Sequence, residues 1–340
     1  EYLKLGIIGL KIDTDIYFGK YYNSSGIGIQ TDFNTKIPFY IKGYGVLNSW
    51  NYFRGFTTFL NAVSHSYVMQ KESFYGCELG VPIGRQFKLT LSSSIGANED
   101  SYYQTDNFST NDTADITSFH ANVTSLKLSS STLNRKRYSS EGRLIGVSCK
   151  YIAGREDYHS GSTASTVENR LNISHYDFRL EAHYEQYIKL YKNIKFGLEV
   201  EGVNSWRNQF FGNYTSTILN APIYQPFPET KTHFFRDYVS YSYLGLGVKI
   251  VRSVGRNIDF VGEAYLYRPS VIIYRTNQNT ANYNYNITSL DYRYLTTAKM
   301  VFHSPIGPLT FAANYYEGQV SPWFFSLNYG YVFFNKRFAK

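Results

Sequence analysis

Trp323-Phe324-Phe325-Ser326-Leu327-Asn328-Tyr329-Gly330-Tyr331-Val332-Phe333 is the stretch that decides the fold. Its odd positions are large and apolar or aromatic, whereas its even positions are mostly small or polar. Because strand side chains alternate between two faces, this pattern indicates a strand with one apolar face. Over 172–189, apolar residues at even positions likewise alternate with charged or histidine residues at odd positions. The repeated pattern predicts an all-β, transmembrane antiparallel up-and-down β-barrel, with lipid outside and water inside.

The composition agrees with this prediction. The chain of 340 residues contains 34 Tyr and 25 Phe but only 2 Met, a balance that favours strands and the aromatic girdles of a barrel. The mean hydropathy of −0.34 is compatible with a membrane barrel because half of each strand faces water. No apolar run reaches the length of about 18 residues that a transmembrane helix needs. A membrane-spanning form must therefore be a closed sheet.

The positive charge does not indicate a nucleic-acid partner. The formal net charge is +8, but Lys and Arg are dispersed along the strands and turns. The basic cluster at 134–137 falls in an expected turn, and the basic cluster at 335–337 lies near the last residue. We expect both clusters to be solvated.

The alternation predicts fourteen strands within a single domain that covers 1–340. The expected ranges are 7–20, 26–35, 37–48, 73–83, 86–97, 116–129, 142–153, 172–189, 194–206, 236–251, 256–268, 290–302, 307–316 and 322–334. Short and long links alternate, as in barrels of the bacterial outer membrane. This predicts exposed long loops at 49–72, 98–115, 154–171, 207–235 and 269–289, and a periplasmic C-terminus. The link 130–141 is a longer exception on the periplasmic side.

The two cysteines do not predict a disulfide. Cys77 and Cys149 each fall in the apolar register of a strand, and these strands are not neighbours in sequence. We expect both to be small lipid-facing side chains.

Four segments resemble the C-terminal barrel of bacterial patatin-like phospholipases, which belongs to the BamA/TamA-like surface-antigen superfamily. They are Leu133–Gly142, Phe211–Ser216 with the following Ala221-Pro222 and Gln225-Pro226, Ser304–Leu309, and Asn328–Arg337. The resemblance implies sixteen strands, of which about fourteen lie in this chain. It implies that Glu1-Tyr2 ends the second strand, that Leu3-Lys4-Leu5-Gly6 is the first periplasmic turn, and that POTRA and patatin domains lie upstream. The sheet formed by this chain alone would then have two open edges.

No catalytic motif is present. A patatin hydrolase needs a Gly-x-Ser-x-Gly elbow, and the nearest strings, at 76–80 and 161–165, do not satisfy it. His175 and His183 lie too far apart along one strand to share a metal. We therefore expect no catalytic residues, no metal and no cofactor in this chain, and we place the phospholipase activity of the parent protein upstream.

Charged residues in the polar register form the candidate lumenal site. They are Arg179, Glu181, Glu199, Glu201, Lys249, Glu263, Arg293 and Lys299. Opposite charges on adjacent strands can pair and rigidify the interior, or they can form a charged constriction that selects solutes. The superfamily's long sixth loop carries a Val/Ile-Arg-Gly-Phe/Tyr motif, which here reads Phe235-Arg236-Asp237-Tyr238. By this resemblance, Arg236 is a candidate residue for latching the loop in the lumen.

The main functional hypothesis is a non-catalytic outer-membrane barrel that anchors or translocates a patatin-like domain. A porin-like solute channel and a BamA/TamA-like assembly factor are the alternatives. The expected partners are outer-membrane lipid and other outer-membrane or periplasmic proteins.

Overall fold

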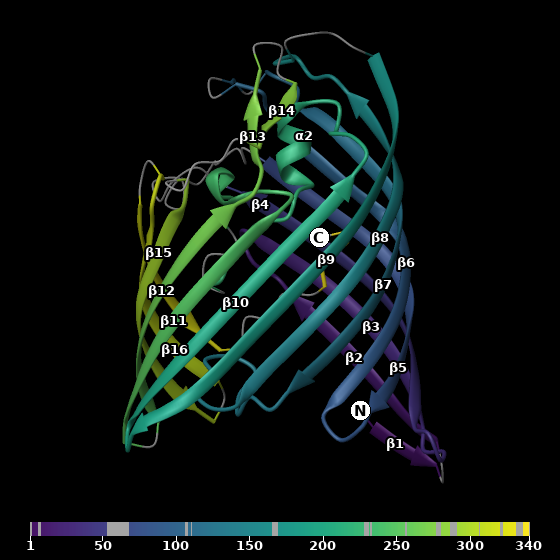
Figure 1. The fold of residues 1–340 in the computed structure, drawn as a ribbon. Coiled ribbons are helices and arrows are strands. Elements are labelled where there is room, and N and C mark those ends of the chain that lie inside the picture. The colour runs from purple at the N-terminus through teal and green to yellow at the C-terminus, as the bar shows by residue number, and fades with distance from the viewer. Residues whose placement is uncertain are drawn as a thin grey trace.

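The computed structural model describes residues 2–5, 8–52, 68–105, 108–109, 111–164, 169–227, 231, 233–255, 257–276, 280–285, 291–305, 307–319, 322–330 and 336–339. Within them, fifteen antiparallel strands form one sheet that curls into a barrel (Figure 1). Each strand pairs with the next along the chain, and β12 is followed in the sheet by β15. β1 and β17 are the two ends of this strand order.

The strands of the sheet vary from four to twenty-three residues in length. Their bounds are β1 Tyr2–Leu5, β2 Ile8–Tyr17, β3 Tyr22–Phe33, β4 Phe39–Tyr52, β5 Val68–Ile83, β6 Phe87–Tyr102, β7 Asp115–Ser131, β8 Arg143–His159, β9 Asn169–Tyr191, β10 Ile194–Arg207, β11 Tyr243–Val254, β12 Ile258–Pro269, β15 Arg293–Ser304, β16 Gly307–Tyr316 and β17 Trp323–Tyr329. β13 Ile272–Arg275 and β14 Ala281–Asn284 form a separate hairpin.

The apolar side chains of the strands point outward, as the alternation predicts. In β17 the exposed residues Trp323, Phe325, Leu327 and Tyr329 alternate with half-buried ones. Cys77 and Cys149 are free thiols on the outward register, so their predicted placement is confirmed. The outer wall is therefore apolar and the inner wall polar, which is the arrangement a membrane barrel requires.

All fourteen predicted strands are present, but β4, β5, β6, β8 and β9 extend into ranges expected to be long loops, and three further details were wrong. Leu3–Leu5, expected in a turn, lie in β1 and pair with Ile8–Leu10. β11 begins at Tyr243 rather than at 236, because Arg236–Tyr238 form a 3₁₀ turn, η2. The link between β12 and β15 contains the β13–β14 hairpin, which the turn-rich sequence did not reveal.

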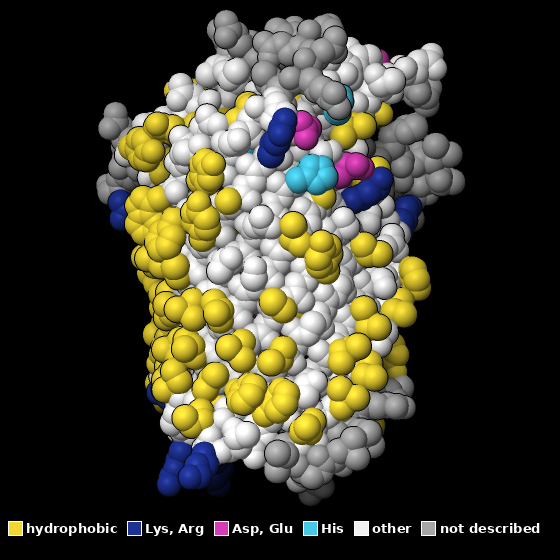
Figure 2. Space-filling view, turned by 90° about the vertical axis from the view of Figure 1, so that its right-hand side faces the viewer, with side chains coloured by type: hydrophobic (Ala, Val, Ile, Leu, Met, Phe, Trp, Pro, Cys, Tyr) yellow, Lys and Arg dark blue, Asp and Glu magenta, His cyan; other side chains and the backbone are white. Residues whose placement is uncertain are grey.

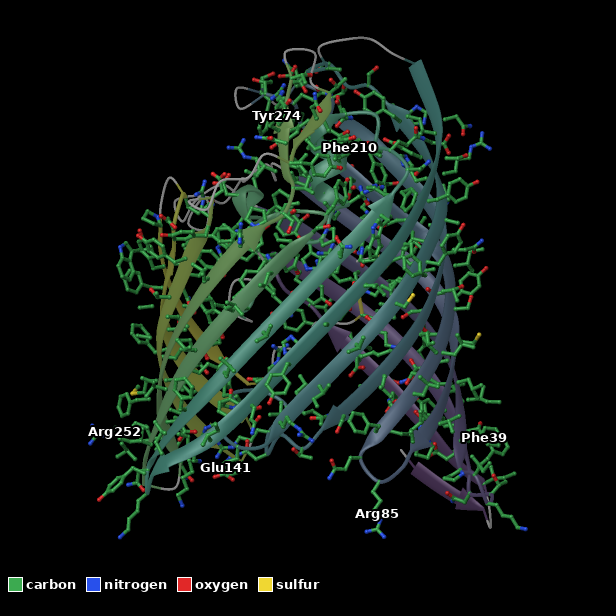
Figure 3. The ribbon with its side chains drawn as sticks, in the orientation of Figure 1. Phe39, Arg85, Glu141, Phe210, Arg252 and Tyr274 are labelled. Carbon is green, nitrogen blue, oxygen red and sulfur yellow. The ribbon has the colours of Figure 1, made fainter. Side chains whose placement is uncertain are left out.

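The two ends of the barrel differ. Phe210 and Tyr274 mark the end where the long links lie, and Arg85, Glu141 and Arg252 mark the end with mostly short turns (Figure 3). No described helix is long and apolar enough to cross a membrane. The buried side chains gather inside the barrel, where inserted segments meet the wall.

Candidate functional site: the occupied lumen

Buried ion pairs join the inner faces of neighbouring strands. Lys249 on β11 places its Nζ 2.6 Å from a carboxylate oxygen of Glu185 on β9 and 2.6 Å from one of Glu199 on β10. Lys299 on β15 pairs with Glu263 on β12 at 3.0 Å. All these side chains are nearly buried. Because each charge has a partner at hydrogen-bonding distance, the cost of removing it from water is offset.

Arg179 and Glu181 lie on the inner face of β9. Arg179 is 1% exposed, and its Nη2 donates to Asp177 at 2.8 Å while its Nη1 donates to the carbonyl of Ala339 at 3.2 Å. Glu181 accepts a 2.6 Å hydrogen bond from the Lys150 ammonium on β8. Arg179 thus connects the wall to a segment that lies 160 residues further along the chain.

A third group brings His183, Glu199 and Glu201 together, with one possible ligand atom from each within 4.8 Å of the others. The two carboxylates already have short contacts, since Lys249 lies 2.6 Å from Glu199 and the Tyr243 hydroxyl donates to Glu201 at 2.6 Å. The Lys249 ammonium would therefore compete with a metal cation for the carboxylate of Glu199. This group extends the ion-pair network of the wall. Spacing along a single strand could not predict it, because His183 lies on β9 and the two glutamates lie on β10.

Arg236 and Arg293 lie near the long-link end, away from this network. The Arg236 side chain is 64% exposed, and its described contact is with the adjacent Asp237 at 3.9 Å. Its latching role therefore stays a prediction. Arg293 is half-buried at the start of β15. In the same link between β10 and β11, Tyr238 is fully buried, and its hydroxyl donates to the carbonyl of Glu317 at 2.8 Å. This hydrogen bond ties the link to the end of β16.

The link between β10 and β11 enters the barrel, although it was expected to be an exposed loop. Tyr224, Phe227 and Phe235 of this link are buried against inward-facing tyrosines of the wall. The ring centroids of Phe227 and Tyr265 are 5.2 Å apart, and those of Phe235 and Tyr316 are 4.1 Å apart. Aromatic rings of this size exclude water when they pack together. An apolar cluster therefore packs against β10, β11, β12, β15 and β16 at the long-link end of the lumen.

The same link also contains a short helix, α2 (Tyr214–Leu219), packed inside the wall (Figure 1). Asn213 caps its N-terminus by accepting a 2.9 Å hydrogen bond from the Ser216 amide. At the other end, the Asn220 side chain donates to Asp100 on β6 at 2.7 Å. Both asparagines are buried, so the helix is held to the wall by satisfied polar groups.

A second inserted segment, Lys336–Ala339, lies inside the barrel. Arg337 donates from Nε and Nη2 to one oxygen of Glu72, at 2.9 and 2.8 Å, and from Nη2 to Gln70 at 2.9 Å. Its guanidinium carbon lies 4.0 Å from the ring centroid of Trp50. Charge-assisted hydrogen bonds and cation–π contact therefore hold the segment to β4 and β5. The expectation that 335–337 is a solvated cluster was wrong for Arg337.

The residues beside Arg337 also contact the wall. Lys336 reaches Glu78 at 2.7 Å, and the Phe338 ring stacks on Phe74 with centroids 5.3 Å apart. Phe338 is 2% exposed. The segment therefore combines charged and aromatic contacts along one side of the lumen.

The link between β7 and β8 covers part of the short-turn end. Arg135 of this link lies 2.9 Å from Asp259 on β12, which also contacts His303 on β15 at 2.7 Å. Glu141 pairs with Lys195 on β10 at 2.8 Å, and hydrogen bonding to that ammonium lowers the pKa of the Glu141 carboxyl. Arg135 was expected in a solvated turn, but it connects the link to the opposite wall.

Between the inserted segments and the wall, the described residues leave a cavity of about 440 Å³. Lys127, Lys150, Glu181 and Glu201 contribute to its lining, so both signs of charge face it. The cavity lies between Arg337 on one side and the link residue Gln225 on another. Its boundary thus includes both inserted segments.

His233 has an unusual environment within the link. The ring is half-buried between Phe235 and Phe324, with centroids 5.8 and 5.1 Å away, and its Nδ1 is buried without a described partner. Burial among rings disfavours the charged imidazolium and lowers the pKa of His233 to about 4. The neutral ring is therefore the form compatible with this packing.

Comparisons with known proteins support the fold. No family model matches the chain, and no curated protein matches it. Among solved structures, BamA from Haemophilus ducreyi lacking POTRA domains 1–3 is similar with a TM-score of 0.59 and 11% identity, over 95% of this chain and 64% of that chain. CdiB from Acinetobacter baumannii has a TM-score of 0.47 and 9% identity, with coverage of 93% and 52%. The ferric preacinetobactin receptor BauA from Acinetobacter baumannii has a TM-score of 0.43 and 9% identity, with coverage of 91% and 49%.

This chain thus spans less than two thirds of each of these solved chains. At such identities the likeness concerns the fold alone. The chain has the fold of a BamA-like outer-membrane β-barrel.

Proposed function

We propose that this chain is a non-catalytic barrel of the bacterial outer membrane whose lumen is sealed, and that it anchors an upstream patatin-like hydrolase domain. The observation that carries the proposal is the occupied lumen. The β10–β11 link and Lys336–Ala339 lie inside the barrel, and the β7–β8 link covers part of one end. A barrel packed in this way is suited to hold another domain at the membrane.

The outer wall supports the membrane location. Exposed apolar side chains occur on many strands, including Ile27, Leu47, Tyr75, Leu126 and Leu246. Such a surface is unfavourable in water and favourable against lipid. Long links of bacterial barrels face outward, so we place the end marked by Phe210 and Tyr274 at the cell surface.

The hydrolase part of the proposal rests on the resemblance of four sequence segments to patatin-like phospholipases. A porin-like channel is less consistent with the buried aromatic cluster of the β10–β11 link, because a diffusion pore needs a continuous water-filled path. An assembly factor remains the second candidate. It is favoured by the likeness in fold to BamA from Haemophilus ducreyi.

The intact mass of the native polypeptide from outer membranes, with its N-terminal peptide, tests the anchor. We expect a mass well above 39.2 kDa, and acyl-hydrolase activity that is lost when the serine of an upstream Gly-x-Ser-x-Gly elbow is replaced by alanine. A mass near 39.2 kDa would contradict the anchor. Upstream modules without hydrolase activity would favour the assembly factor.

A further inference from the structure

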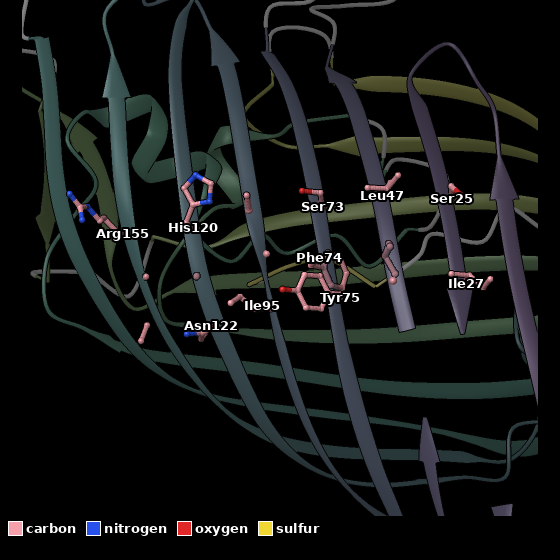
Figure 4. A pocket seen from close by; sticks show the side chains of 17 residues that line it. Ser25, Ile27, Leu47, Ser73, Phe74, Tyr75, Ile95, His120, Asn122 and Arg155 are labelled. Atoms are coloured by element: carbon pink, nitrogen blue, oxygen red, sulfur yellow. The ribbon is translucent and has the colours of Figure 1, made fainter. Parts of the chain in front are cut away.

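A groove crosses the outer wall of the barrel over six strands, from β3 to β8. Its volume is about 810 Å³, within the range of roughly 300–1,000 Å³ that ligand pockets occupy. Strand pairing aligns two outward-facing rows of residues along it. One row is Ser25, Leu47, Ser73, Ala97, His120 and Arg155. Ser25, Leu47, Ser73, His120 and Arg155 of this row are labelled in Figure 4.

The groove exists because small residues interrupt an otherwise bulky apolar surface. Gly45 lies in the second row beside Tyr75, and a Cβ added at Gly45 would meet no described atom within 4 Å. Ile27, Leu47 and Tyr75 are all more than half exposed around it. The part of the groove on β3–β6 is thus an open apolar trough that fits hydrocarbon chains.

The other end of the groove is polar. His120 on β7 and Arg155 on β8 are paired positions on the outward face, and both are exposed. Within the described contacts, neither side chain has a hydrogen bond or an ion pair. An outward-facing arginine on a membrane barrel is unfavourable unless a headgroup or water meets its charge. The fork of N–H donors on a guanidinium matches the oxygens of a phosphate, as it does those of a carboxylate.

Further polar residues lie between this end and the long links. Asp157 is two positions beyond Arg155 on the same face of β8, and Lys71 pairs with Glu99 at 3.3 Å on the next row. Figure 2 shows basic, acidic and histidine side chains gathered near this rim, above hydrophobic side chains. Carboxylates beside a cation suit a headgroup that carries hydroxyls as well as phosphate, because carboxylates accept hydrogen bonds from hydroxyls.

We propose that this groove binds a phosphorylated glycolipid of the outer leaflet, with acyl chains in the trough at Gly45 and a sugar phosphate at His120 and Arg155. The order along the wall matches that of the lipid: apolar trough, cationic pair, then mixed polar rim. The assignment rests on the membrane orientation proposed above, but it is independent of any upstream hydrolase. Arg268, an exposed outward arginine on β12, is outside this groove and provides a matched control.

Native mass spectrometry of the purified folded barrel tests the site, with lipid A as the probe. Folding of each variant is checked by the heat-dependent change in gel migration. The wild type should retain one lipid A. Arg155→Gln should bind it about tenfold more weakly, as expected for loss of a charge-assisted hydrogen bond. Gly45→Leu should also weaken binding because it fills the trough, and Arg268→Gln should not.

Two comparison lipids identify the chemistry. Dephosphorylated lipid A should bind about as weakly to the wild type as lipid A does to Arg155→Gln, and phosphatidylglycerol should be retained less than lipid A. Equal retention of the phosphorylated and dephosphorylated forms, or equal weakening by Arg155→Gln and Arg268→Gln, would overturn the proposal. Preferential retention of phosphatidylglycerol, or dimerisation through this wall without bound lipid, would also overturn it. None of these outcomes depends on whether an acyl hydrolase precedes the barrel.

Discussion

Arg337 donates two hydrogen bonds, of 2.9 and 2.8 Å, to a single carboxylate oxygen of Glu72, although the two residues are 265 positions apart in the sequence. The other oxygen of Glu72 accepts from the Phe338 amide at 3.1 Å and from the Asn48 side chain at 3.1 Å. One buried carboxylate on β5 therefore holds both the side chain and the backbone of the inserted segment.

Replacing Glu72 by glutamine should lower the free energy of unfolding by roughly 3–5 kcal/mol, because the Arg337 guanidinium loses its carboxylate partner inside the lumen. Urea unfolding of the reconstituted barrel measures this loss. The matched control is Lys71→Gln, one position away on the outer face, where the ion pair with Glu99 is exposed. Its effect should stay below about 1 kcal/mol. Similar losses of unfolding free energy for both variants would contradict the contact between Glu72 and the inserted segment Lys336–Ala339.

Leu180→Arg on the outward face of β9 should cost roughly 2–4 kcal/mol if this position lies near the middle of the bilayer. Leu190→Arg, near the short-turn end of the same strand, should cost about 0–1 kcal/mol because its charge can reach the interface. The same unfolding measurement in lipid vesicles compares them. A larger loss of unfolding free energy for Leu190→Arg than for Leu180→Arg would contradict the position of the bilayer along β9.

Acidification should loosen the β10–β11 link through His233. The pKa of His233 is about 4 in the folded protein, below the value of about 6.5 of a free histidine, so folding favours the neutral ring. Its stabilising contribution is complete above pH 6.5 and is lost as the pH falls toward 4. Urea midpoints at pH 7.5 and pH 5 should therefore differ more for the wild type than for His233→Gln. An identical pH dependence of the two proteins would exclude this role.

Gly142 allows the β7–β8 link to turn back toward β8. Its φ is +93°, and an added Cβ would lie 2.1 Å from the carbonyl oxygen of Thr132. Gly142→Ala should destabilise the barrel by about 1–3 kcal/mol. Gly43→Ala is the control, since a Cβ at Gly43 would meet no described atom within 4 Å, and it should change stability by less than about 0.5 kcal/mol. Equal thermal stability of both variants and the wild type would contradict this account of the turn.

The wall of the barrel could be predicted from the sequence because successive strand residues face lipid and lumen in turn, and apolar and polar residues alternate accordingly. In β9, for example, Phe178 and Leu180 are exposed on the outside while Asp177 and Arg179 are buried inside. The fourteen predicted strands follow from such patterns. The end of β1 was misplaced and the β13–β14 hairpin was missed, because four residues are too few to display a period.

The contents of the lumen could not be predicted in the same way. A link that mixes polar and aromatic residues, such as 208–242, does not show by its alternation whether it lies in outside water or against the inner wall. Its buried Tyr224, Phe227 and Phe235 were a usable signal, since three large rings in a supposedly exposed loop are unusual. The Arg337–Glu72 contact had no local signal, because it depends on the whole sheet bringing β5 beside the final segment.

The conductance of the folded barrel in planar lipid bilayers tests the sealed lumen most directly. The wild type should insert without a steady open-pore current, because the inserted segments occupy the interior. A variant that lacks 336–340 and has a short glycine-serine link in place of 208–242 should conduct, which shows that insertion was achieved. A stable open-pore current from the wild type, equal to that of the variant, would contradict the sealed barrel and favour a solute channel.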